Sequence, residues 1–146
     1  MSVIAWDGMR LAADKRASLG TLIRTTTKVF RSTRGALVAY AGDADAGEAV
    51  LAWFEEGAHP DRFPASQRDK DQWAGLLVVW PDGRLWKYER TPHPVKFPPQ
   101  MFAIGCGRDF ALAAMHLGKT APEAVEVACH FDSACGNGVD TLTFAE

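Results

Sequence analysis

Short runs of apolar and β-branched residues, separated by glycine and proline, cover the opening and the middle of the chain. Such runs are typical of strands, and two pairs of them form hairpins, because Asp7-Gly8 and Pro81-Asp82-Gly83 are turn sequences. We expect a polar connection over residues 15–20 and an extended, proline-containing excursion over 90–100. The sequence predicts strands or extended segments over residues 2–6, 11–14, 21–27, 28–31, 36–41, 74–80, 84–89, 102–104 and 139–144.

The hydrophobic period changes to that of an amphipathic helix in three places. Ala46, Val50, Trp53 and Phe54 share one helical face, so we expect a helix from residue 44 to Gly57. Apolar spacing predicts a second helix over 110–117. A capping box, Thr120 to Glu123, begins a third, which extends toward the Gly136-Asn137-Gly138 turn. The segment 59–71 is weakly patterned, and we expect a loop with at most one helical turn.

The order of these elements indicates the fold class. Strands come from both halves of the chain and helices come in separate blocks, which favours an α+β protein with two antiparallel sheets and the helices outside them. With 146 residues and no repeat or linker, the chain is expected to form a single domain over residues 1–146.

Composition narrows the function classes. A net charge of −2 argues against nucleic-acid or anionic-membrane binding. No apolar run approaches the roughly 20 residues that span a bilayer, and the N-terminus has no secretory pattern, so a cytoplasmic location is expected. The three cysteines and four histidines follow no metal-ligand spacing. We therefore expect free thiols, no metal and no cofactor.

The N-terminus offers a candidate nucleophile. Because the chain starts directly in a predicted strand, we expect no flexible leader, and a small second residue permits removal of Met1. Ser2 would then carry a hydroxyl and a free α-amine, a nucleophile and a base on one residue. An ordinary second-position serine without chemistry is the alternative, and the choice depends on whether the chain supplies partners.

Three further residues could assist Ser2. A lysine at position 28 would favour the alkoxide, and Asp14 would orient that lysine, although spacing alone does not bring Lys28 to Ser2. Gly42 lies between a strand and a helix start, where a backbone N–H can bind an oxyanion. The alternatives are a surface lysine, a strand-end aspartate and a plain turn.

The remaining candidates are sulfur and carboxylate groups near two later turns. Cys106 lies in Gly105-Cys106-Gly107, a second strand-to-helix junction, and a Cys–His nucleophile there is a rival interpretation. Asp132 and Cys135 follow the last predicted helix before a glycine-rich turn. Alone, neither indicates a function.

In this order, the motifs resemble those of proteasome β-subunits and HslV, most closely the short phage- and bacterium-encoded members that open Met-Thr-Thr-Ile-Ala-Tyr. The similarity covers nearly the whole chain. The matching segments are Ser2-Val3-Ile4-Ala5 for the N-terminal strand, Leu11 to Ser18 for A-A-D-S-R-A-T, Thr27 to Arg31 for the lysine strand, Ala41-Gly42-Asp43 for A-G-G, Ile104 to Gly107 for I-G-S-G and Phe131 to Gly136 for R-D-A-Y-S-G.

The resemblance implies a four-layer αββα N-terminal-nucleophile (Ntn) hydrolase that cleaves peptide bonds through Ser2. Asp14, Lys28 and Gly42 would take the roles described above, and Cys106, Asp132 and Cys135 would take the places of the accessory serine, aspartate and serine. The implied partners are peptide or protein substrates, a homo-oligomeric ring and an ATP-dependent unfoldase. The chain departs from the family pattern in three ways. The nucleophile would be a serine, both accessory serines are replaced by cysteine, and the second long central helix is reduced to a loop around residues 65–71. A non-catalytic assembly subunit and a small-molecule amidase are the alternatives.

Overall fold

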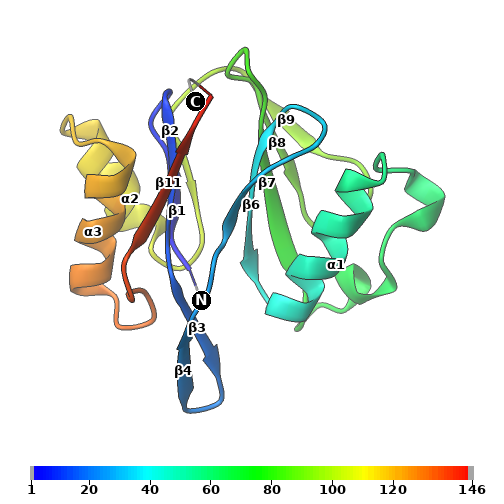
Figure 1. The fold of residues 1–146 in the computed structure, drawn as a ribbon, viewed down its shortest axis with the longest axis horizontal. Helices are drawn as coiled ribbons and strands as arrows, with labels where there is room; N and C mark the ends of the chain where they lie inside the picture. The colour runs from blue at the N-terminus through cyan, green and yellow to red at the C-terminus, as the bar shows by residue number, and fades with distance from the viewer. Residues whose placement is uncertain (1, 145–146) are drawn as a thin grey trace.

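The computed structural model describes residues 2–144, and its strands form two main antiparallel sheets (Figure 1). The first sheet has the strand order β10-β1-β2-β11, with every neighbouring pair antiparallel. Its strands are β1 (Ile4–Trp6), β2 (Arg10–Asp14), β10 (Phe102–Ile104) and β11 (Val139–Thr143). The predicted opening hairpin is confirmed, since Ile4 pairs with Ala13 and Trp6 with Leu11.

The second sheet has five strands in the order β5-β6-β7-β8-β9 and is also antiparallel. Its strands are β5 (Val29–Arg31), β6 (Leu37–Gly42), β7 (Ala74–Val79), β8 (Leu85–Tyr88) and β9 (Val95–Phe97). β6 and β7 lie in the centre and are nearly all buried, which explains why their sequences are continuous apolar runs rather than alternating ones.

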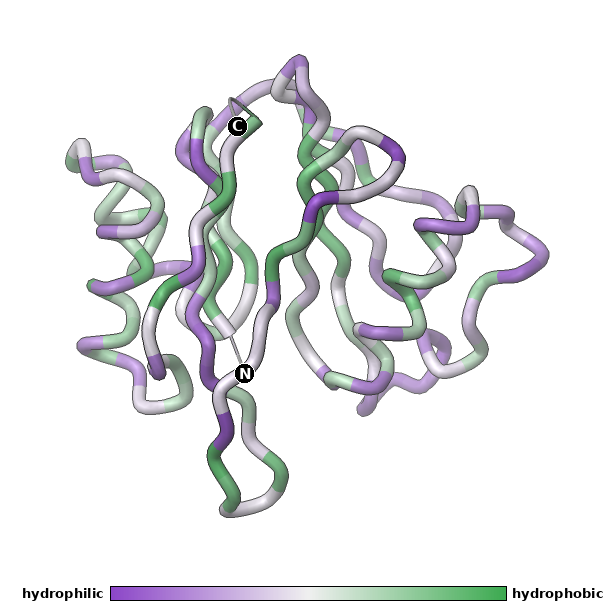
Figure 2. Tube along the Cα trace, in the orientation of Figure 1, coloured by the Kyte–Doolittle hydropathy of each residue, from purple (hydrophilic) through white to green (hydrophobic). Residues whose placement is uncertain are grey.

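An apolar core joins the two sheets. Side chains from the first sheet, including Ile4, Leu11 and Ile104, pack against Leu37 and Leu77 of the second. Figure 2 shows hydrophobic stretches along the strands of both sheets, whereas the loop beyond α1 is largely hydrophilic. Burying this many aliphatic side chains, at about 1.5–3 kcal/mol each, is the main force that holds the sheets together.

Helices cover the outer face of each sheet (Figure 1). α2 (Arg108–His116) and α3 (Ala121–Phe131) pack on the first sheet through small residues, which allow close approach, and α1 (Ala44–Glu55) packs on the second. Asp43 caps α1 by accepting a hydrogen bond from Ala46 N, and the predicted capping box begins α3. No helix in the described part of the chain is both long and apolar enough to cross a membrane.

The expected polar connection over residues 15–20 is wrong. Arg16–Leu19 forms β3, which pairs with β4 (Leu22–Thr25) in a separate two-stranded hairpin. Gly20 has a φ of +61° and, with Thr21, makes the tight turn. The hairpin extends away from both sheets, and its residues are exposed or half-buried (Figure 1).

Two loops also contain more structure than expected. The segment 59–71 holds two short 3₁₀ turns, Pro60–Arg62 and Ala65–Arg68, rather than at most one. The buried Gln67 holds this segment against β7, because its amide bonds both the N–H and the carbonyl of Ala74. The extended segment 90–100 includes strand β9. As expected, no second long helix follows α1 over residues 56–73, all of which the structure describes.

Candidate active site

Ser2 lies just before β1 and is buried, with 3% of its surface exposed. Its carbonyl accepts hydrogen bonds from Gly107 N at 3.2 Å and from Cys106 Sγ at 3.4 Å, so the loop before α2 holds the start of the chain. Gly105, with a φ of +96°, must be glycine because a Cβ there would collide with the Ser2 carbonyl. The predicted removal of Met1 lies outside the described residues.

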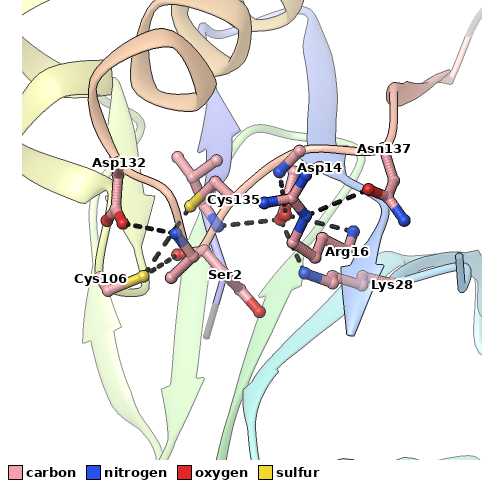
Figure 3. Close-up of polar contacts among 11 residues, drawn as sticks. Ser2, Asp14, Arg16, Lys28, Cys106, Asp132, Cys135 and Asn137 are labelled. Atoms are coloured by element: carbon pink, nitrogen blue, oxygen red, sulfur yellow. Dashed lines mark hydrogen bonds and ion pairs between the residues drawn. The ribbon is translucent and has the colours of Figure 1, made fainter. Parts of the chain in front are cut away.

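Asp14 is fully buried at the end of β2 and accepts four hydrogen bonds. Oδ1 accepts from Val3 N at 3.1 Å and from Lys28 Nζ at 2.7 Å, and Oδ2 accepts from Arg16 N at 3.3 Å and Gly136 N at 3.1 Å. Donors on every side compensate a buried carboxylate for the water it has lost. Asp14 therefore fixes the residue after Ser2, the lysine and the turn after α3 relative to one another (Figure 3).

Lys28 reaches this carboxylate from the segment before β5 and is itself buried, with 4% of its surface exposed. Its ammonium forms the ion pair with Asp14 of the first sheet. Lys28 and Ser2 both line a small cavity of about 50 Å³, together with Tyr40 and Gly42. The fold thus brings the lysine to Ser2, which spacing alone does not predict.

Gly42 ends β6 with a φ of +124°, directly before the Asp43 cap of α1. A Cβ at this position would come within 2.5 Å of the Trp73 carbonyl oxygen and 2.9 Å of Ala74 Cα, so only glycine fits. Gly42 also lines a second cleft with Ser2, of about 270 Å³. Its backbone therefore lines both of the spaces beside Ser2.

Cys106, Asp132 and Cys135 meet beside the Ser2 carbonyl (Figure 3). The two Sγ atoms lie 3.8 Å apart, and Asp132 Oδ1 accepts from Ala134 N at 2.9 Å. Burial, together with the neighbouring Cys106 and Asp14, raises the pKa of the Cys135 thiol well above its ordinary value, so this thiol is neutral near pH 7. Within residues 2–144 no hydrogen bond joins Cys106 to a histidine, which gives the rival Cys–His nucleophile no support.

Several residues at the site carried no role in the sequence interpretation. Arg16 donates from Nε to Asn137 Oδ1 at 3.1 Å and from Nη1 to the Ser133 carbonyl at 2.6 Å, and so holds the turn after α3. Trp73, Lys87 and Arg108 line the larger cleft. No spacing rule points to them, because they come from three separate segments, namely the loop before β7, strand β8 and the start of α2.

A larger cavity than either of those beside Ser2 lies elsewhere in the described chain. It has a volume of about 530 Å³ and is lined by residues such as Trp6, Met9 and Phe144, at the other end of β1 from Ser2. We place the candidate site at Ser2 despite the smaller volume, because a candidate nucleophile, a buried ion pair and a backbone position that admits only glycine converge there.

The arrangement of the two sheets and the flanking helices is similar to that of HslV. The crystal structure of eukaryotic HslV from Trypanosoma brucei matches with a TM-score of 0.71 and 17% identity, over 97% of this chain and 97% of that one. Thiobacillus denitrificans BPH in complex with epoxomicin matches with a TM-score of 0.70 and 17% identity over 99% of both chains, and a second structure of BPH gives 0.67 and 17% over 97% and 95%. This likeness confirms the α+β fold class alone. No protein-family model and no curated protein sequence matches the chain.

Proposed function

We propose that the protein is an Ntn peptidase, a single-domain four-layer αββα sandwich that hydrolyses peptide bonds through Ser2 once Met1 is removed. One observation carries the proposal: Asp14 Oδ1 binds both Lys28 Nζ and the N–H of Val3, the residue that follows Ser2. A buried ion pair has a desolvation cost that a solvent-exposed pair avoids. The position of the Asp14–Lys28 pair next to Ser2 is explained if the lysine acts on the Ser2 hydroxyl.

The proposed reaction has two steps. The Ser2 hydroxyl attacks the amide carbonyl while the Ser2 α-amine takes its proton, through a water if needed, and the same amine then protonates the leaving amine. Lys28 lowers the pKa of the hydroxyl, Asp14 orients Lys28, and the Gly42 N–H stabilises the oxyanion. Water then hydrolyses the ester on Ser2, which releases the acid and restores the enzyme.

Cys106, Asp132 and Cys135 are proposed to support the amine and Asp14 from the other side of Ser2. Thiols are weaker hydrogen-bond donors than hydroxyls, so this support is weaker than serines would provide. The proposal extends to peptide or protein substrates, a homo-oligomeric ring, an ATP-dependent unfoldase as partner and a cytoplasmic location, as the sequence resemblance implies.

Intact mass followed by active-site labelling tests the proposal. The mature protein should lack Met1, and a peptide epoxyketone such as epoxomicin should add one equivalent, because its carbonyl and epoxide carbons can bond the hydroxyl and the amine of one residue. Ser2→Ala should abolish labelling, whereas Ser66→Ala, at an exposed serine of the loop before β7, should retain it. Persistent labelling of Ser2→Ala would rule out Ser2 as the nucleophile.

Two observations favour the alternatives. Both accessory positions hold thiols, one of them buried and neutral, which favours a non-catalytic assembly subunit. A mature protein that keeps Met1 would support this alternative. The cavity between Ser2 and Tyr40 measures only about 50 Å³, which favours a small acyl group and hence a small-molecule amidase. A panel of peptides and simple acylamides separates peptidase from amidase.

A further inference from the structure

Three potential metal ligands converge from two loops that are distant in the sequence. Cys106 lies in the turn before α2, and Asp132 and Cys135 lie in the turn after α3. Their sulfur atoms and a carboxylate oxygen all lie within 4.8 Å of one another. Sequence spacing does not reveal the group, because helices α2 and α3 separate its members.

The separation of the two sulfurs suits a tetrahedral metal better than a disulfide. With Zn–S bonds of about 2.3 Å and an angle of about 109°, two thiolates on one zinc ion lie about 3.8 Å apart. The Sγ atoms of Cys106 and Cys135 are 3.8 Å apart. A disulfide requires about 2.05 Å, so the two thiols would have to move toward each other by well over an ångström.

The turn after α3 already orients its two ligands. Ala134 N–H donates to Asp132 Oδ1, and Cys135 N–H donates to the Asp132 carbonyl at 3.1 Å. Arg16 holds the same turn through the Ser133 carbonyl. Hydrogen bonds of this kind fix ligand direction and reduce the ordering that metal binding would require.

The cluster is open on one side. Cys135 is buried, with 2% of its surface exposed, whereas Cys106 is exposed and lines the cleft of about 270 Å³ that Ser2 also lines. A cation therefore has a path of entry from this cleft. A site with three protein ligands and an open side leaves a fourth position for water.

The structure assigns Cys106, Asp132 and Cys135 as a binding site for a divalent cation of the Zn²⁺ type, held by two thiolates and one carboxylate. Thiolates select such ions over Mg²⁺ or Ca²⁺, which prefer oxygen ligands. Binding releases the two thiol protons and replaces the Cys106 hydrogen bond to the Ser2 carbonyl. The site goes beyond the proposed peptidase activity and does not depend on it. If that activity is present, bound metal occupies the groups proposed to support the Ser2 amine and inhibits it.

Cobalt is the direct probe, because a thiolate–Co²⁺ bond gives a charge-transfer band and a tetrahedral site gives intense d–d bands. The full chain, reduced and metal-free, should bind one Co²⁺ and release it to Zn²⁺. Cys106→Ser, Cys135→Ser and Asp132→Asn should each weaken binding at least tenfold. Cys129→Ser is the matched control and should bind as the wild type does, since Cys129 lies on α3 outside the cluster. Circular dichroism checks that each variant is folded.

A second measurement needs no variant. In the wild-type protein, Zn²⁺ should slow alkylation of Cys106 and Cys135 and leave the rate at Cys129 unchanged. Three results overturn the assignment. The first is a wild type that shows no charge-transfer band, and the second is a band that persists in a Cys106→Ser/Cys135→Ser double variant. The third is a Cys106–Cys135 disulfide in a protein that binds no Co²⁺. Ser2→Ala should keep Co²⁺ binding, so failure of the metal site and failure of the peptidase proposal are distinguishable.

Discussion

The ammonium of Lys28 lies 2.7 Å from Oδ1 of Asp14, and both side chains are almost completely buried. This contact joins the two sheets, because Asp14 ends β2 of the first sheet and Lys28 immediately precedes β5 of the second. The same oxygen also accepts the Val3 N–H. The position of the lysine and the position of the residue that follows Ser2 are therefore fixed through one atom.

Replacing Lys28 with methionine should destabilise the protein and abolish labelling of Ser2. Methionine is apolar and similar in length to lysine but leaves Asp14 without its cation, and breaking a buried pair in this way costs about 3–5 kcal/mol. The matched control is Lys15→Met, because Lys15 lies 3.4 Å from Asp140 in a partly exposed pair, which contributes less than about 1 kcal/mol. Urea unfolding measures the free energy of unfolding of both variants, and an equal decrease in the two would contradict the prediction.

Gly42→Ala should be more harmful than an alanine at any open turn glycine. At Gly42 a Cβ meets the backbone of Trp73 and Ala74, which cannot give way easily, and the positive φ adds strain of about 1–3 kcal/mol. Gly35→Ala is the control, since Gly35 has a φ of +86° but no atom within 4 Å of the added Cβ. Thermal unfolding should show a clearly larger loss of melting temperature for Gly42→Ala, with loss of labelling at Ser2 as well.

The contrast between β6 and β3 shows what the sequence can and cannot predict. Leu37–Gly42 is predictable because a continuous apolar run has to be buried. Arg16–Leu19 is not, because this hairpin strand projects from the sheets and its side chains have no core to face. At the site, family order suggests Asp14 and Lys28, but only the register of β1 against β2 brings Asp14 to Val3. The convergence of Cys106 with Cys135 depends in turn on how α2 packs against α3, which no local pattern encodes.

The pH dependence of stability should contain a contribution from Cys129. Burial raises the pKa of this thiol from an ordinary value near 9 to about 11 in the folded protein. Between these two values the unfolded chain loses the proton while the folded chain keeps it, so the free energy of unfolding falls as the pH rises from about 9 to about 11. Cys129→Ser should flatten that part of the curve relative to wild type, whereas an unchanged slope would contradict it. Below pH 8 the two curves should run parallel.

Arg16→Lys should loosen the turn after α3 while leaving the sheets intact. The guanidinium bonds Asn137 and the Ser133 carbonyl at the same time, and lysine cannot reproduce this two-sided geometry. Hydrogen bonds from a charged group contribute about 1.5–3 kcal/mol each, so the turn should open more often. Because Gly136 N donates to Asp14 from this turn, its amide should exchange with deuterium at least tenfold faster. Arg84→Lys, at an exposed pair with Asp82, should leave that rate unchanged. Labelling by the epoxyketone separates two roles of Arg16. If Arg16 acts only on stability, folded Arg16→Lys will be labelled at the wild-type rate. If Arg16 positions the Asp14–Lys28 pair, labelling will slow even where the variant is fully folded.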